Sequence, residues 1–145
     1  MLSDGVAAAW VLENELMAFG EHARADRLQV GDAVAVYVSR GAFHNPTRDE
    51  AQIVATGRVT REIRKDPKMI AGRQFNVTCH IALDQRAPLR HGSPFKSMVP
   101  HLSFIRESQA WGAYVRRGLV LLPDGDFEMI ASALRKHLAT PAQRT

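Results

Sequence analysis

The chain has 145 residues, of which 46% are hydrophobic, and its formal net charge is +4. This length predicts one domain, and this apolar content is ordinary for a globular protein with a core. No apolar run approaches the roughly 20 residues that a membrane helix needs, and the single cysteine, Cys79, excludes an intramolecular disulfide.

The first 20 residues lack the basic and apolar regions of a signal peptide, because Asp4, Glu13 and Glu15 interrupt them. We therefore expect a cytoplasmic protein with no membrane partner, folded as a single domain over residues 1–145 with its core at about 8–138. Most of the 19 basic residues are Arg, which binds phosphate in planar, bidentate contacts. The charge permits nucleic-acid binding but does not require it.

Residues 1–19 contain good helix formers without a clean helical stripe, so propensity alone predicts a helix there. Gly31 and Asp32 then form a turn, and residues 33–39 alternate as a β-strand. One face of this strand is apolar and belongs in a core: Val34, Val36 and Val38.

The opposite face of this strand carries Tyr37 and Ser39, and a loop rich in stacking and hydrogen-bonding side chains follows it. These loop residues are Arg40, Phe43, His44, Asn45 and Arg48. Together they predict a surface that binds a flat polar ligand.

Two further strands are predicted, over residues 51–60 and 74–83. Gly57 in the first strand indicates a β-bulge or a close backbone approach, whereas Asp66-Pro67 after it predicts a turn. The second strand alternates with a period of two and directs five apolar side chains inward: Phe75, Val77, Cys79, Ile81 and Leu83. Cys79 is therefore expected to fill the core.

Prolines break up the next stretch and leave residues 95–102 as a short helical or irregular segment. A short helix is predicted over residues 106–117, with Trp111 and Tyr114 on one face. A brief final strand is predicted over residues 119–122.

The best helix in the sequence begins at Asp124 or Asp126. Its apolar positions form an amphipathic stripe: Phe127, Ile130, Ala131, Leu134 and Leu138. We expect this helix to pack on the sheet.

Signatures of catalysis and cofactor binding are absent from the sequence. The six histidines occur at none of the close spacings of zinc sites, and there is no H-E-x-x-H, nucleotide-binding glycine loop or G-x-S-x-G. We therefore expect no metal, no cofactor and no catalytic residue. An acid-base pocket of Asp49, Glu50, Lys65 or His80 is an alternative, although their spacing selects no geometry.

A run of basic side chains follows the second predicted strand. Its members are Arg58, Arg61, Arg64, Lys65 and Lys68. These side chains are suited to bind successive phosphates of a nucleic acid. The alternative is that they are ordinary solvent-exposed residues at the end of a strand.

The order of several motifs resembles the EVE domain family, which belongs to the PUA-like superfamily together with YTH and ASCH domains. The pattern is G-D-x-x-x-x-Y-x-[ST] on a strand, preceded by W-V-L-E-N-E-L-M-A-F and followed by I-V-A-T-G-R-V. It continues through R-G-A-F-H-N-P-T-R-D, L-S-F-I-R at 102–106, the Trp111 region and a closing helix. The resemblance spans about residues 8–138.

The resemblance implies an α+β fold, namely a PUA-like, mixed five- or six-stranded, partly open β-barrel flanked by short helices, with a C-terminal amphipathic helix. It implies that residues 8–12 form the first barrel strand, against their helix propensity. It also implies that the protein binds DNA or RNA by taking a modified, flipped-out base into an aromatic pocket.

Carried over by position, six residues would form the base pocket: Trp10, Tyr37, Ser39, Asn45, Phe104 and Trp111. Three arginines would hold flanking phosphates: Arg40, Arg48 and Arg58. We therefore expect a non-catalytic binding module. The alternatives are a small hydrolase of modified nucleosides, of the ASCH type, and a domain that binds a small molecule or a protein segment.

Overall fold

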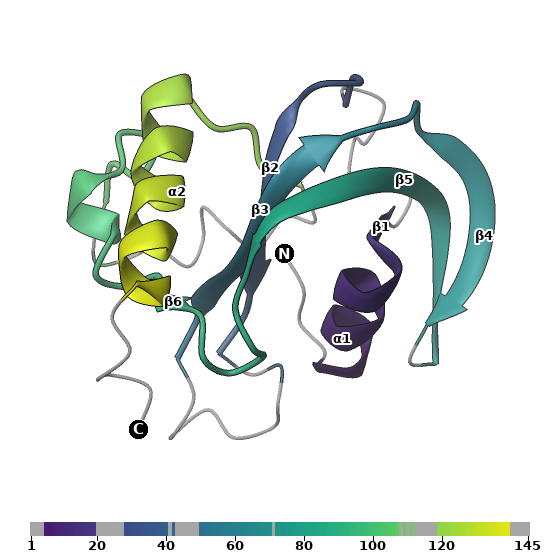
Figure 1. Cartoon of the computed structure of the whole chain (residues 1–145), viewed down its shortest axis with the longest axis horizontal. Helices are drawn as coiled ribbons and strands as arrows, with labels where there is room; N and C mark the ends of the chain where they lie inside the picture. Colours follow the sequence, from purple (N-terminus) through teal and green to yellow (C-terminus); the bar gives the residue numbers. More distant parts are fainter. Residues whose placement is uncertain are drawn as a thin grey trace.

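The protein has an α+β fold in which a curled antiparallel sheet forms a half-barrel, with one helix inside the curl and one outside it (Figure 1). The computed structural model describes residues 5–19, 28–40, 42, 50–70, 72–107, 109, 111 and 119–139. Within these ranges, no helix is both long and apolar enough to cross a membrane. In chain order the elements are α1 (Gly5–Asn14), β1 (Leu16–Phe19), β2 (Ala33–Val38), β3 (Gln52–Val59), β4 (Arg64–Ile70), β5 (Arg73–Arg86), β6 (Ser93–Pro94), η2 (Val99–His101) and α2 (Asp124–Leu138).

The 14-residue strand β5 organises the sheet. β1 pairs with one edge of β5, β3 and β4 pair with the other edge, and β2 pairs with β3 as an outer strand. The short β6 also pairs with β3. The expected five- or six-stranded, partly open barrel is consistent with this six-stranded sheet. The three strands predicted at 33–39, 51–60 and 74–83 are confirmed. All pairings among the described strands are antiparallel, so the expected mixed sheet is wrong.

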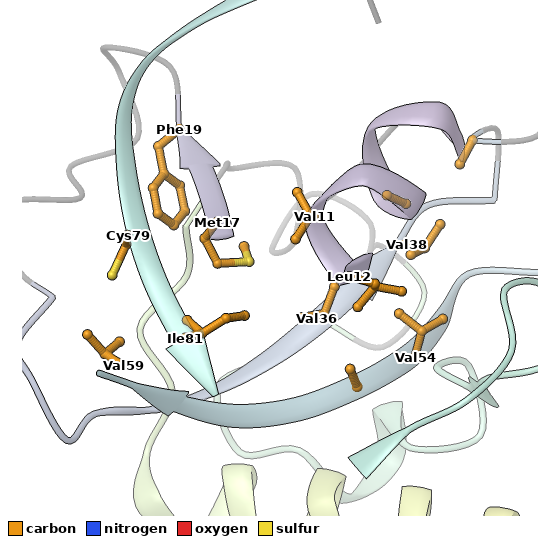
Figure 2. Packing of buried hydrophobic residues seen from close by; sticks show 13 residues of the cluster. Val11, Leu12, Met17, Phe19, Val36, Val38, Val54, Val59, Cys79 and Ile81 are labelled. Atoms are coloured by element: carbon orange, nitrogen blue, oxygen red, sulfur yellow. The ribbon is translucent and has the colours of Figure 1, made fainter. Parts of the chain in front are cut away.

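The concave face of the sheet holds the first hydrophobic core. Val36 and Val38 of β2 are buried there against Val11 and Leu12 of α1 (Figure 2). Cys79 of β5 belongs to the same cluster, as predicted. The apolar alternation of β2 therefore does place its valine face in a core.

The other face of the sheet is covered by α2, and a second core lies between them. Ile130 and Leu134 of α2 are buried in a cluster with Ile53 of β3 and Phe95. The predicted stripe of α2 is thus confirmed. Tyr37 packs against the same cluster, so the second face of β2 is also a packed face.

A polar bridge joins α2 to the sheet inside this second layer. The buried hydroxyl of Thr56 donates a hydrogen bond to Asp84 Oδ1 at 2.6 Å. Gln85 Nε2 donates to Thr56 Oγ1 at 3.0 Å and to the carbonyl oxygen of Ala131 at 3.2 Å. Because the polar groups of the bridge are paired, the bridge fixes the helix on the sheet without an unsatisfied buried group.

The N-terminal segment forms the helix α1, so the barrel strand implied at residues 8–12 is wrong. The buried positions of α1 follow a helical spacing: Ala7, Ala8, Val11 and Leu12. Glu15 ends the helix with φ +48°, and its carboxylate accepts the backbone N–H of Leu83 at 3.0 Å. The first strand is instead β1, four residues that pair with β5. Here the local helix propensity and the burial pattern agree.

The turn predicted at Asp66-Pro67 is also wrong. Both residues lie within β4, at a break in its register with β5 between Lys65 and Lys68. Among the described strands, β4 pairs only with β5, and a proline is tolerated in an outer strand because its missing N–H is not needed for the ladder.

Predictions for the segment between the sheet and α2 have mixed outcomes. The short helical segment expected within 95–102 is confirmed as η2. Residues 119–122 form neither helix nor strand, so the brief final strand is wrong. The helix expected over 106–117 falls largely outside the described residues.

Gly57 allows β3 to approach β5 closely. A Cβ atom at this position would clash with the backbone carbonyl oxygen of Ala82, and the register of the two strands shifts between Thr56 and Gly57. The close approach that the sequence indicated at Gly57 is therefore confirmed.

We expect Gly57→Ala to lower the free energy of unfolding by about 1–3 kcal/mol, because the two strands must separate locally to admit the methyl group. Gly125→Ala is the matched control, since a Cβ atom there meets nothing within 4 Å and the residue lies in the first turn of α2. The control should be neutral or slightly stabilising. Urea denaturation measures both variants, and equal stabilities would contradict this role for Gly57.

Candidate functional site

A cavity of about 630 Å³ lies beside the outer strand β2, and we call it the β2 pocket. Part of its lining comes from the turn before β2 and from β2 itself: Gly31, Asp32, Ala33, Val34, Ala35 and Tyr37. A second stretch of the lining precedes α2: Leu119, Val120, Leu121 and Leu122. The volume lies within the range of pockets that hold small molecules.

The β2 pocket follows the edge of β2 that has no partner strand among the described residues, which we call the free edge. Val34 and Val59, which belong to the core on the concave face, contribute to its lining. Tyr37 and Ile53, which pack beneath α2, contribute as well. Because side chains alternate between the two faces of a strand, a cavity lined from both faces of β2 must pass around its edge.

Aromatic rings form the wall of the pocket beneath α2. The rings that line it are Tyr37, Phe95, Phe104 and Phe127. Tyr37 meets Phe95 edge to face, with ring centroids 5.1 Å apart and planes at 87°. Trp111 packs on the same Phe95 at 5.4 Å. These contacts hold the wall in place before any ligand binds.

Tyr37 adds a polar group to this apolar wall. Burial raises the pKa of its phenol to about 12, so the hydroxyl stays protonated throughout the physiological range. No described residue forms a hydrogen bond with this hydroxyl. A neutral phenol can donate or accept a hydrogen bond from a ligand.

Four exposed charged side chains also line the pocket. Three are carboxylates and one is a guanidinium: Asp32, Asp124, Glu128 and Arg58. Arg58 Nη1 donates to the carbonyl oxygen of Gly31 at 3.0 Å, which holds the guanidinium beside the turn. The described lining therefore carries more negative than positive charge.

Three of the predicted site residues line the β2 pocket: Tyr37, Phe104 and Arg58. Trp111 lies behind this lining through its contact with Phe95. Asn45 and Arg48, which were also predicted, lie outside the described residues.

Trp10, Ser39 and Arg40 do not line the pocket. Trp10 was assigned to it on the assumption of a strand at 8–12, whereas the residue belongs to α1 and packs on the clusters that α1 contacts. Ser39 and Arg40 follow the end of β2, and the lining from that strand stops at Tyr37.

The residues of the acid-base alternative do not meet at the β2 pocket. Glu50 and Lys65 are exposed, His80 is half-buried, and none of the three lines the pocket. Asp49 lies outside the described residues. In the part of the chain that is described, no three His, Cys, Asp or Glu side chains converge in a way that could hold a metal ion.

Sequence reasoning missed Phe95 and the pocket-lining role of Phe127. Phe95 lies in a stretch broken by prolines, and it is buried through contacts with Tyr37 and Trp111 that are distant in the sequence. Phe127 was identified only as part of the apolar stripe of α2. The sequence feature that could have identified Phe95 as a site residue is an aromatic side chain within a segment rich in proline.

Asp126 holds the segment that carries Phe104. Its Oδ1 accepts the backbone N–H and the hydroxyl of Ser103 at 3.0 and 2.9 Å, and its Oδ2 accepts the N–H of Phe104 at 2.9 Å. Burial acts to raise the pKa of this carboxyl, but the three hydrogen bonds outweigh burial and lower the pKa. The carboxylate thus ties Phe104 to the first turn of α2.

Comparison of the sequence with models of known protein families and with curated proteins finds no match.

We expect Asp126→Asn to lower the free energy of unfolding by about 1–3 kcal/mol near neutral pH, because an amide cannot replace all three accepted hydrogen bonds. The pKa of Asp126 is lower in the folded than in the unfolded chain, so its stabilisation is complete above the unfolded value of about 4 and is lost as pH falls through the folded value. The difference between variant and parent should therefore shrink in acid.

Chemical denaturation from neutral to acidic pH measures this difference. Glu128→Gln is the control, because Glu128 is exposed on the same helix. A stability difference for Asp126→Asn that does not change with pH would contradict the role of its charge.

Proposed function

We propose that the protein is a non-catalytic nucleic-acid-binding module, which takes a modified, flipped-out base of DNA or RNA into the β2 pocket. The observation that carries this proposal is the aromatic wall of Tyr37, Phe95 and Phe104 along a cavity of about 630 Å³. A flipped base loses its stacking partners, and proteins that accept one supply aromatic or apolar surfaces instead. As part of the same proposal, the half-barrel is of the PUA-like type and the chain is a member of the EVE family. The order of the motifs along the sequence supports this part of the proposal.

The contacts of the wall support this use. Tyr37 and Phe95 are locked edge to face, and Asp126 ties the Phe104 segment to α2. A base would therefore meet rings whose positions are already fixed, and little conformational entropy is lost when it binds. The neutral phenol of Tyr37 offers one hydrogen bond to the edge of the base.

Basic side chains on the pocket lining and along the chain beyond it support contacts with flanking phosphates. Arg58 lines the pocket, and three exposed basic residues follow it along the chain: Arg61, Arg64 and Lys65. Contacts of this kind position a nucleic acid without reading its sequence.

A small-molecule ligand is the second candidate, and the three carboxylates of the lining favour it. Asp32, Asp124 and Glu128 repel a phosphate that approaches them. A free base or nucleoside carries no phosphate and meets no such repulsion. Comparing oligonucleotides with nucleosides separates the two candidates.

We expect an oligonucleotide that contains a modified base such as 5-methylcytosine to bind more tightly than its unmodified counterpart. Tyr37→Ala and Phe104→Ala should each weaken binding by roughly 5- to 150-fold, because stacking contributes about 1–3 kcal/mol per base. Fluorescence anisotropy with labelled single- and double-stranded DNA and RNA measures these affinities.

Phe75→Ala is the matched control, since this half-buried ring lies outside the pocket and packs on a separate cluster near α1. It should leave binding unchanged in the folded protein. Equal affinity for modified and unmodified strands, together with unaltered binding by Tyr37→Ala, would refute the proposal. Binding of nucleosides alone would favour the small-molecule candidate, and release of a product from an acylated nucleoside would favour the hydrolase alternative.

A further inference from the structure

Two of the outer strands, β2 and β4, differ in how their edges are protected. Outer strands usually carry lysine, proline or bulges that discourage pairing with other groups. β4 has these features in Lys65, Pro67 and Lys68. Both strands also shift register with their partners, β4 between Lys65 and Lys68 and β2 between Val36 and Tyr37, beyond Ala33 and Ala35. β2 reads A-V-A-V-Y-V and contains neither a charged residue nor a proline. Its edge is therefore suited to accept hydrogen bonds from a further group.

The ladder between β2 and β3 determines which backbone groups of β2 face its free edge. The carbonyl oxygen of Asp32 accepts the N–H of Val59 at 2.9 Å, so the backbone of Asp32 faces β3. Residues that face a partner strand alternate with residues that face away. In the register that pairs Val34 with Gly57, the N–H and C=O groups of Ala33 and Ala35 point away from β3.

Ala33 and Ala35 both line the β2 pocket. Among the described residues, no backbone or side-chain partner is found for their outward-facing groups. Residues 119–122, which also line the pocket, form no regular ladder with β2. The pocket therefore contains main-chain donors and acceptors beside an aromatic wall.

We propose that the hydrogen-bonding edge of the bound base is read by the main chain of Ala33 and Ala35. The inference rests on the proposed function and names the chemical class of ligand. The N–H and C=O of one outward-facing residue lie close together on a strand edge, so those of Ala35 match a planar heterocycle with an acceptor and a donor on adjacent positions, and those of Ala33 form the next such pair along the edge. The rings of Tyr37 and Phe104 then hold the flat faces of the same heterocycle, and β2 supplies specificity without polar side chains.

Amide hydrogen exchange, followed by NMR on the full chain, tests this inference. The probes are cytidine, 5-methylcytidine, adenosine, guanosine and uridine. In the free protein the amides of Ala33 and Ala35 should exchange quickly, whereas those of Val34 and Val36 are protected by β3. At about ten times the Kd of a nucleoside that binds, exchange at Ala35 should slow about tenfold, since only the unbound fraction exchanges.

A pair of substitutions gives an independent measurement. Ala35→Pro removes the outward N–H, and an outer strand tolerates proline where the N–H is not in the ladder. It should weaken binding of the same nucleoside about tenfold, the usual cost of one hydrogen bond. Ala35→Ser keeps the N–H and should weaken binding much less than Ala35→Pro, whereas Phe75→Ala, outside the pocket, should bind like the parent. If Ala35→Pro fails to fold, the exchange measurement on the parent protein decides.

The outcomes separate the inference from the proposed function. Binding that shifts the signals of Tyr37 and Phe104 without slowing exchange at Ala33 or Ala35 would overturn main-chain reading and leave the base pocket standing. Absence of binding by all five nucleosides and by the modified oligonucleotides would overturn both. Slowed exchange together with weaker binding by Ala35→Pro supports the inference.

Discussion

The sheet depends on the pairing of β5 with strands on both of its edges. β1 lies along one edge, and β3 and β4 follow one another along the other. A strand of 14 residues that serves three partners has to bend with the twist of the sheet. The bend is accommodated where Gly57 passes close to Ala82, at a shift of register. This curvature encloses the first core and leaves β2 as an outer strand.

β2 is an outer strand, but packing on both of its faces holds it in place. Val36 and Val38 are buried against α1, and Tyr37 packs under α2. α2 is in turn tied to the sheet through Gln85 and to the Phe104 segment through Asp126. In the described part of the chain, only the edge of the strand has no partner, so the β2 pocket has firm walls and main-chain groups that no described residue pairs with. A site of this kind binds with little rearrangement of its walls.

Elements were predictable where one face of a segment is apolar and its period is unambiguous, as in β2, β5 and α2. The strand implied at 8–12 was wrong because the burial of Ala8 and Leu12 follows a helix, and Pro67 suggested a turn where an outer strand tolerates proline. At the site, Tyr37 and Phe104 were found from motif order. Phe95 was not, since its burial depends on residues far along the chain. No local pattern could show that residues 119–122 line a pocket instead of pairing.

The pocket lining and the basic segment beyond Arg58 carry charges of opposite sign, so the proposed contacts with phosphates and with the base belong to different parts of the surface. A net charge of +4 draws a polyanion towards the protein, and the exposed Arg61 and Arg64 lie along the chain beyond Arg58. The pocket lining itself carries the carboxylates of Asp32, Asp124 and Glu128. A nucleic acid would therefore place its phosphates over the basic segment and only an uncharged base in the pocket. Salt should then weaken the phosphate contacts, which release counterions, and leave stacking on Tyr37 largely unaffected.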